Sequence, residues 1–572
     1  MKTFGGVVRL SFLLRNAAPI FAGAAMCTQM IACADENDPK TWVKRLDDPA
    51  QRSTAVKRLS DYFNDQMTKS GNDREKPEIK ALLDVIVEPM TKVYTAGTLD
   101  EKTRKELMKT LADTRDARTT PALAKAFSDY EPGKNDEDVK FAAQSVNGMA
   151  TAGKLTDQGV IDALWTVFSK FQVSKAKSIE LVKALHEAVL AVKSPSYGPK
   201  AVEKLGAAVT PDVDSQKDQI QFWQLTSIQV IKLIKYAPAV KPLVIVLLTP
   251  SKSDLRATAS SALLTMGKEA EPVLLAAFNA TDPDLAKLAF ADKTHLTILA
   301  DTLGAISRPG GKEAILKALP GVDNETNRRW LATSLVKFPT DARTIAAFED
   351  AYKKMPSASN EDIAARGAVA QATSQFYDAT VVDFLLKEIT AAKGDNASAL
   401  QIPALEAAIK LMVPAQQAGV GAAVAKLTAF MAHNGTETER GQMGLIKGLY
   451  DASVTTLQKC GQDAGCYVKV LDEPIVSGAG GNSKAIKAAW MAAMYGNDAT
   501  RAALTAKVTN VRNPGARLAL VEAIDHLAPK GDTAAAGTLE KVVEADTASG
   551  NKDLQAGDDV VVKVALRLRA RS

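Results

Sequence analysis

The sequence predicts an all-α fold, an α-solenoid of stacked antiparallel helix pairs. The main observation is a phrase that recurs through the second half of the chain. Each copy has an Ala/Leu-rich stretch, a turn with Asp-Ala or Pro-Ala, and a second amphipathic stretch. The turn alanines Ala342, Ala379, Ala415 and Ala452 follow at steps of 37, 36 and 37 residues. Such a period is typical of units that bury their apolar faces only by stacking.

The composition and the positions of Pro, Gly and helix-capping residues also favour this fold. The 572 residues are 46% hydrophobic but only 5% aromatic, and helix-forming residues dominate. Pro and Gly lie between the periods, where they interrupt helices. Four segments place a hydroxyl three residues before a carboxylate ahead of an apolar run, which predicts capping boxes. These segments begin at Thr98, Ser251, Thr281 and Ser359.

Residues 1–32 are expected to be a signal peptide. Basic residues precede an apolar stretch from Ala17 to Ala32, which is too short and interrupted for a stable transmembrane helix. The four residues that end at Cys33 resemble the bacterial lipobox, in which the cysteine is lipidated and becomes the mature N-terminus. Cys27 is a poorer rival site. Cleavage without lipidation, or a start codon placed upstream of the true one, are the alternatives.

A lipidated Cys33 would open a short acidic tether, residues 33–41. The following residue is Ala34 rather than Asp, which by analogy with Gram-negative sorting favours the outer membrane, facing the periplasm. Beyond the leader, the charge is almost balanced, because three positive charges of the net +5 lie within it. We therefore expect no nucleic acid partner, and membrane contact through the lipid anchor only.

Residues 42–572 are expected to form the repeats, which are clearest at 103–130, 238–280 and 326–546. In the second of these, apolar residues from Val240 follow helical spacing, a turn comes at 250–253, and another helix runs from Leu255 to Gly267, which is expected to end it. With this pattern continued, the chain would hold about 12 to 14 helix pairs that contact only near neighbours, in an elongated particle.

This unit resembles the short bacterial type of HEAT repeat, in which two helices joined by a turn are stacked in tandem. In that family an Asp/Arg pair by the second helix forms a hydrogen-bonded ladder between adjacent units. The resemblance places Asp254 and Arg256 in that pair, and implies the same structural role for Arg328, Asp341 and Arg343. Repeats are structural motifs, so no activity is implied.

A fifth copy of the phrase has its turn alanine at Ala499, 47 residues after Ala452. The insertion that lengthens this step contains two lone cysteines, Cys460 and Cys466. An exported chain would oxidise them, so we expect a disulfide that closes a small loop between two repeat helices. A redox-active pair or half of a metal site are the functional alternatives. Metal needs further ligands, and the four histidines are scattered singly. They are His186, His295, His433 and His526.

No catalytic constellation is found in the sequence. The glycine-rich segment 477–484 lacks the Gly-Lys-Ser/Thr order of a phosphate-binding loop and is expected to be a linker. The five tryptophans follow helical patterns and are expected in the core. The segment from Val560 is expected to cap the solenoid, with its basic residues in water. The basic residues are Lys563, Arg567, Arg569 and Arg571, and the tryptophans are Trp42, Trp165, Trp223, Trp330 and Trp490.

The expected function is therefore that of a non-enzymatic envelope lipoprotein, without cofactor or metal, which binds a protein or peptide along its concave face as a scaffold or assembly component. An extended curved surface suits broad partners better than small molecules. The alternative is an auxiliary subunit of an enzyme, or a HEAT-like lyase. It requires a cytosolic chain and a functional acid, base or thiol in the groove, and the leader counts against it.

Overall fold

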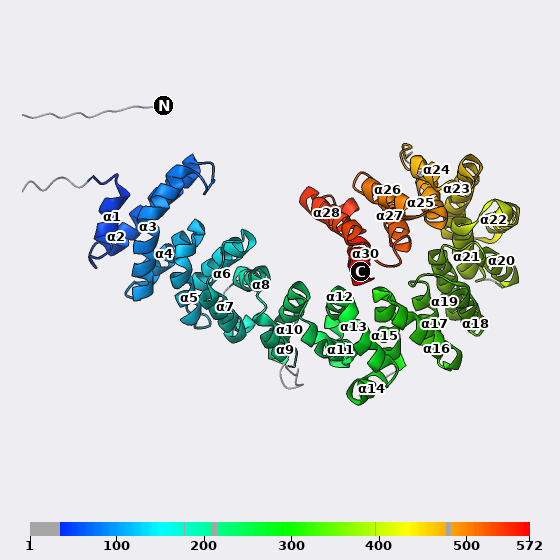
Figure 1. Ribbon diagram of the computed structural model, residues 1–572, viewed down its shortest axis with the longest axis horizontal. Coiled ribbons are helices and arrows are strands. Elements are labelled where there is room, and N and C mark those ends of the chain that lie inside the picture. The colour runs from blue at the N-terminus through cyan, green and yellow to red at the C-terminus, as the bar shows by residue number, and fades with distance from the viewer. Residues whose placement is uncertain are drawn as a thin grey trace, which may run out of the picture. The chain divides into compact units, whose positions relative to one another are not determined.

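A computed structural model describes residues 35–176, 178–206, 214–291, 293–394, 396–475 and 482–571. All regular structure in these residues is helical, with short 3-10 turns between α-helices and no strand (Figure 1). The predicted all-α solenoid class is therefore confirmed. Cys27 and Cys33 lie outside the described residues. The chain divides into two compact units, and the boundary in the sequence lies between Thr119 and Thr120.

In the first unit, the described residues from 35 onward form four α-helices that pack as a solenoid segment. Its helices are α1 (Pro39–Arg45), α2 (Arg52–Lys69), α3 (Pro77–Ala96) and α4 (Glu101–Thr114). Asp38 caps α1, whose first residue is proline, and Asp100 caps α4 by accepting from the Thr103 amide. In the packed interface of α2 and α4, the Ser60 and Thr110 hydroxyls hydrogen-bond at 2.6 Å. Each buried hydroxyl is thereby satisfied.

In the second unit, the described residues form α-helices α5 to α30, which also stack in pairs. The first six are α5 (Thr120–Ser128), α6 (Asp136–Thr151), α7 (Gln158–Lys170), α8 (Ile179–Val192), α9 (Tyr197–Leu205) and α10 (Asp214–Ile234). The next ten are α11 (Val240–Leu248), α12 (Arg256–Thr265), α13 (Gly267–Phe278), α14 (Pro283–Ala289), α15 (Lys293–Ile306), α16 (Pro309–Ala318), α17 (Glu325–Leu335), α18 (Ala342–Lys353), α19 (Asn360–Ala372) and α20 (Val381–Ala391). The last ten are α21 (Ser398–Leu411), α22 (Gln417–Asn434), α23 (Glu437–Cys460), α24 (Ala464–Val470), α25 (Ser483–Tyr495), α26 (Asp498–Val508), α27 (Pro514–His526), α28 (Thr533–Ser549), α29 (Lys552–Gln555) and α30 (Asp558–Arg571).

Small residues let neighbouring helices approach closely, as their abundance in the sequence predicts. Gly367 of α19 lies against α21, and a Cβ at this position would meet the Ala399 carbonyl oxygen at 2.0 Å. On α21 itself, Ala404, Ala407 and Ala408 are fully buried. This packing of backbone against backbone explains why the repeat phrase is rich in Ala.

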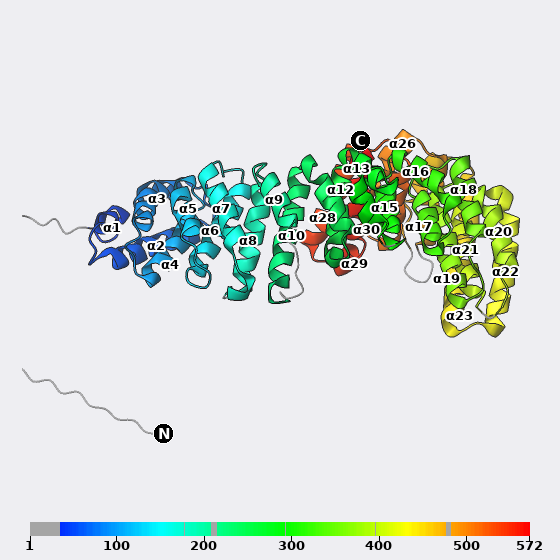
Figure 2. The same ribbon diagram turned by 90° about the horizontal axis from the view of Figure 1, so that it is seen from below.

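Residues 256–571, from α12 to α30, form a closed ring, which we call the C-terminal ring. Its inner helices pack side by side in the order α12, α15, α17, α19, α21, α23, α25, α27 and α30. The last of them, α30, then packs against α12, α13 and α15, as both Figure 1 and Figure 2 show. The expectation that units contact only near neighbours is therefore wrong here, because tight curvature returns the end of the chain to α12.

Gly267 has a different role from the predicted one. It does not end a helix but begins α13, after α12 ends at Thr265. A Cβ on Gly267 would lie 2.6 Å from the Cβ of Ala570 on α30. The absence of a side chain at this position is what allows the ring to close so tightly.

Two kinds of local prediction need correction. Ala452 lies inside the long helix α23 rather than in a turn, because no helix-breaking residue adjoins it. Of the four predicted capping boxes, the one at Ser359 forms, with Asp362 as its partner. Asp100 and Asp282 cap α4 and α14 instead of the threonines that precede them. A carboxylate nearer to the helix start is the better acceptor for the free amides.

The five tryptophans differ in how deeply they are buried. Trp42, Trp165 and Trp490 are buried, as predicted. Trp223 is partly exposed, and its indole N–H donates to the Phe168 carbonyl. Trp330 of α17 is 42% exposed, so the prediction that it belongs to the core is wrong. Helical spacing identifies a face of a helix, but does not say whether another element covers that face.

Candidate functional site: the inner face of the C-terminal ring

The structure contains the predicted disulfide between Cys460 and Cys466, whose Cα atoms are 5.4 Å apart. Cys460 is the last residue of α23, and Cys466 lies in the first turn of α24, which Asp463 caps. The bridge therefore joins the end of one repeat helix to the start of the next, as the spacing predicts. Gly461 directly follows Cys460, and its positive φ of 57° lets the chain turn tightly after α23.

Two predicted ladder residues link adjacent repeats. Asp341 caps α18 and also accepts a hydrogen bond from Lys312 of α16, at 2.9 Å. Arg343 pairs with Glu313 of the same neighbouring helix, at 2.8 Å. The Lys312 hydrogen bond is the main reason why the pKa of Asp341 lies below its ordinary value. Both contacts join α16 to α18 and so link adjacent repeats.

The other predicted ladder residues make different contacts. Arg328 of α17 donates to the carbonyls of Val322 and Lys354. It thereby joins the turn that precedes α17 to the turn that follows α18. Arg256 reaches the ring of His295 at 3.5 Å rather than Asp254. Asp254 is exposed, and it makes no ladder contact among the described residues. The Asp254–Arg256 pair therefore does not form the predicted ladder step.

Basic residues of α30 close the ring instead of lying in water. Arg567 donates to the Ala305 carbonyl at 3.1 Å, and Arg571 donates to the Ser307 hydroxyl at 3.0 Å. From the opposite side, Arg308 donates to the Ala570 carbonyl at 2.9 Å. The Arg571 side chain is only 5% exposed, which corrects the prediction of a solvated basic edge. Lys563, at 66%, does lie in water.

Asp525 of α27 holds these arginines in place. It forms ion pairs with Arg567 and, at 3.0 Å, with Arg571, and all three side chains are largely buried. Two guanidinium groups together donate to both oxygens of this buried carboxylate, so its acceptors are satisfied. Asp525 thus joins α27 and α30 at the point where α30 meets α15.

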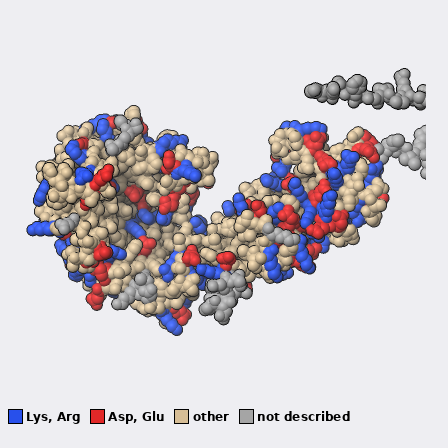
Figure 3. Space-filling view, turned by 180° about the vertical axis from the view of Figure 1, so that it is seen from behind, with Lys and Arg blue, Asp and Glu red and all other residues tan. Residues whose placement is uncertain are grey.

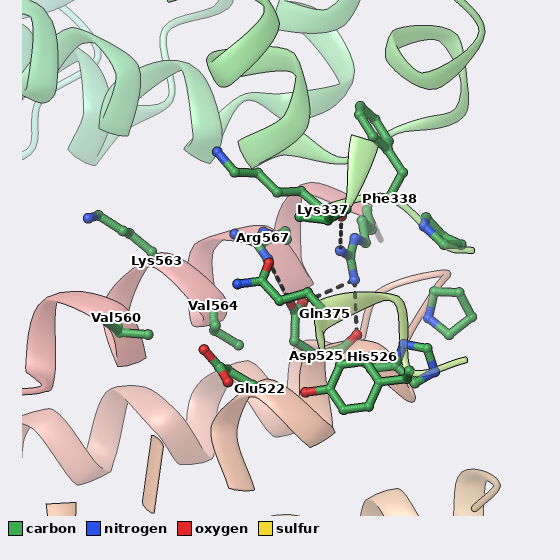
Figure 4. A pocket seen from close by; sticks show the side chains of 15 residues that line it. Lys337, Phe338, Gln375, Glu522, Asp525, His526, Val560, Lys563, Val564 and Arg567 are labelled. Atoms are coloured by element: carbon green, nitrogen blue, oxygen red, sulfur yellow. Dashed lines mark hydrogen bonds and ion pairs between the residues drawn. The ribbon is translucent and has the colours of Figure 1, made fainter. Parts of the chain in front are cut away.

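A cavity of about 260 Å³ opens beside this cluster on the inner side of the ring (Figure 4). It lies between α27, α30 and the turns that follow α17 and α19. Apolar residues form part of its wall, and charged or polar residues form the rest. The apolar ones include Val336, Phe338, Pro339, Pro529, Val560 and Val564, and the others include Lys337, Gln375, Glu522, Asp525, Lys563 and Arg567.

Glu522 and Gln375 extend toward each other across this cavity in Figure 4. Burial raises the pKa of Glu522, with a further contribution from the nearby negative charge of Asp525. Among the described residues, no ion pair or hydrogen bond reaches its carboxyl group. Beside it, the hydroxyl of Tyr377 is buried without a partner. The cavity therefore holds polar groups that the protein itself leaves unused.

An aromatic stack forms the floor next to these groups. The Tyr377 ring lies between Trp490, at 5.3 Å, and His526, at 4.2 Å. Tyr377 has a left-handed backbone, with a φ of 50°, which is unusual for an aromatic residue and orients its ring into the stack. Burial lowers the pKa of His526 to about 4, so the imidazole is neutral at physiological pH.

Lys487 of α25 is fully buried beside the same stack. Its ammonium group donates to the carbonyls of Ile409, Lys410 and Met412, at 2.8–2.9 Å. These carbonyls end α21, so the lysine caps a helix C-terminus more than 70 residues away in the sequence. Burial lowers the pKa of Lys487, whereas the three acceptors match the three protons of the ammonium form.

A second, larger space of about 720 Å³ lies between α21, α23 and α25, and we call it the inner groove. Ile402, Ile446 and Leu449 provide apolar surface, and Leu445 is 51% exposed at its edge. Amide and hydroxyl side chains lie around them. These are Gln371, Asn396, Ser398, Gln442, Asn482 and Ser483. Figure 3 shows the ring hollowed at its centre, with charges of both signs around the hollow.

Sequence reasoning did not find Glu522, Lys487 or the ring-closing role of Arg567. In the sequence, His526 is only one of four scattered histidines. The sequence pattern that points to such residues is a single charged or titratable side chain within an Ala-rich helix, such as Lys487 in AIKAAWMAA. That signal identifies a helix face of mixed polarity, but it does not identify the helix that covers it.

We expect acid to destabilise the protein through His526. An unfolded histidine binds a proton below about pH 6.5, whereas the folded one does so only near 4. Stability should therefore fall as the pH drops through this window. The His526→Gln variant should lose about 2 kcal/mol less than the wild type between about pH 7 and pH 5. Denaturant unfolding at both pH values measures this difference.

The matched control is His433→Gln, a change on the exposed surface of α22. It should follow the wild type at both pH values. Equal losses in all three proteins would show that His526 takes up its proton as readily in the folded protein as in the unfolded chain.

The described residues contain no group of three or more His, Cys, Asp or Glu placed to hold a metal ion. None of their helices has both the length and the hydrophobicity needed to span a bilayer. No protein-family model matches the sequence, and no curated protein is significantly similar to it. Among solved structures, the chain is similar to a homology model of the full-length AP-3 complex in an intermediate open conformation. The identity is 11% and the TM-score 0.26, over 92% of this chain and 93% of the other.

Proposed function

We propose that the protein is a non-catalytic scaffold of the bacterial envelope, and that it binds a segment of a partner protein in the inner groove. The observation that carries this proposal is one open space on an inner face that combines apolar residues, with Leu445 exposed at its edge, and amide side chains. The proposal refines the predicted concave binding surface, because it names the helices that form it.

The chemistry of the inner groove suits an extended or helical peptide. Leu445 is half-exposed and offers apolar area for a side chain of the partner, next to the largely buried Ile402, Ile446 and Leu449. The Gln442 amide carries both donors and an acceptor, which peptide C=O and N–H groups require, and Gln371 offers its amide oxygen while its amide nitrogen donates to Glu406. Such a site favours a polypeptide over a compact polar metabolite, since most of its specificity would come from shape and backbone hydrogen bonds.

Replacing Leu445 with Asp tests this site. The side chain is 51% exposed, so the change should leave the fold intact but place a charge at the apolar edge of the groove. Immobilised wild-type protein should capture a defined partner from an extract of its own envelope, and the variant should capture at least about tenfold less. Quantitative mass spectrometry of the bound fraction measures this.

Phe430→Asp is the matched control, since Phe430 of α22 is also 51% exposed but does not line the groove. It should capture the partner as the wild type does. Equal capture by Leu445→Asp, or a wild type that binds no envelope protein, would contradict the proposed function.

We further propose that lipidation of Cys33 anchors the protein to a membrane, with the outer membrane as its destination. The lipobox resemblance of the leader supports this, and the Cys460–Cys466 disulfide fits an oxidising compartment. A palmitate analogue fed to a host that processes lipoproteins should label the wild type but not Cys33→Ser. Labelling that is lost only in Cys27→Ser would move the site, and labelling of every variant would refute the anchor.

A further inference from the structure

The cavity beside α27 and α30 holds a carboxyl group that has no partner in the protein. Burying a carboxyl without an ion pair or hydrogen bond costs stability, so such groups are rare outside sites that bind something. Glu522 is partly buried and has no such partner among the described residues, and Figure 4 shows it reaching into the cavity. Its side chain is therefore available to a ligand.

The cations near Glu522 are already engaged elsewhere. In the cavity wall, Lys337 pairs with Asp301, Lys563 with Asp559 and Arg571 with Asp525. Arg567 is bound by Asp525 and by the Ala305 carbonyl. Lys410 forms an ion pair with Glu406 at 2.7 Å and lies over the Trp490 ring. Both stabilise the ionised carboxyl only from a distance. A positively charged ligand would supply the direct partner that these residues do not.

Two further oxygen acceptors line the same cavity. Tyr377 is only 8% exposed, and its hydroxyl has no hydrogen-bond partner. The Gln375 side chain reaches toward Glu522 from the opposite wall. A carboxylate, an amide oxygen and a phenol oxygen can together accept the three protons of a primary ammonium group.

The apolar part of the cavity wall suits a ligand whose positive charge is carried on an alkyl chain. Val560, Val564 and Phe338 line the cavity near the polar groups. The volume of about 260 Å³ is far above the roughly 10–15 Å³ that one water needs. An aliphatic stem could pack on this apolar surface while the ammonium group lies between the oxygens, as buried lysine side chains do.

We propose that this cavity binds a primary alkylammonium group, either that of a free amine or that of a lysine side chain on a partner segment. The lysine source rests on the proposed protein-binding function, whereas the free amine does not. The ammonium pairs with Glu522, and the hydroxyl of Tyr377 and the amide of Gln375 complete its hydrogen bonds.

Thermal unfolding of the full chain tests the site. About 20 mM n-butylammonium chloride should raise the melting temperature by about 2 °C or more relative to potassium chloride with n-butanol. The peptide acetyl-Gly-Lys-Gly-amide, compared with its norleucine analogue, forms the second arm. Saturation-transfer NMR on the butyl methyl group reports binding independently of stability.

Glu522→Gln should abolish both responses, while the exposed-surface control Glu361→Gln should retain them. Stabilisation by the amine alone assigns the site to free amines, stabilisation by the peptide alone assigns it to a partner's lysine, and stabilisation by both identifies the ammonium group itself as sufficient. If neither probe binds, or if Glu522→Gln responds as the wild type does, the proposal is overturned. Capture of a partner in the Leu445 experiment is unaffected by that outcome.

Discussion

Replacing Lys487 with methionine is expected to lower the free energy of unfolding of the C-terminal ring by about 3–5 kcal/mol. Methionine keeps most of the apolar stem but offers no donor to the three carbonyls that end α21. The contacts with the carbonyls of Ile409 and Met412 are buried, so solvent is poorly placed to replace the lost ammonium group. Denaturant unfolding measures the loss, and hydrogen exchange of residues 398–412 should show where protection is lost.

Lys484→Met on the same helix is the control for this change. The Lys484 side chain is half-exposed, and its ion pair with Glu473 spans 3.9 Å. Its replacement should change stability by no more than about 0.5 kcal/mol. A similar effect of both substitutions would mean that Lys487 contributes only its stem to the packing, and not its three hydrogen bonds.

Removal of two arginines should open the C-terminal ring. In the double variant Arg567→Ala/Arg571→Ala, Asp525 loses both cationic partners, and α30 loses its contacts with Ala305 and Ser307. Leaving a buried carboxylate unpaired costs roughly 3–5 kcal/mol, which is enough to release a single terminal helix. Spin labels at positions 287 and 541 should then give a broad distribution of distances instead of a narrow one.

The labelled chain needs serine at positions 27 and 33, so that only the introduced cysteines react. Lys563→Ala, on the exposed side of α30, is the control and should leave the distribution narrow. A double variant that stays narrow would show that apolar packing of α30 on α12 and α13 is enough to hold the ring closed.

Much of the local architecture can be predicted from the sequence. The period of the repeat phrase, the Ala-rich stretches and the Asp341–Arg343 motif identify stacked helix pairs and one inter-repeat ladder step. The capping box at Ser359 and the disulfide between Cys460 and Cys466 involve residues three and six positions apart, so spacing alone predicts them. Prediction failed at Ala452, because a short phrase cannot tell a turn from an uninterrupted helix.

The sequence by itself thus determined the class of fold, since helix propensity, periodicity and caps act over a few residues. Only the tertiary structure decided that residues 256–571 close into a ring, because closure depends on small rotations that accumulate over many repeats. Packing of α25 against α21 buries Lys487 and the same closure buries Arg571, although the sequence presents both as ordinary surface charges. It also leaves Glu522 without a partner, because a residue's neighbours are set by packing between helices that are distant in the chain.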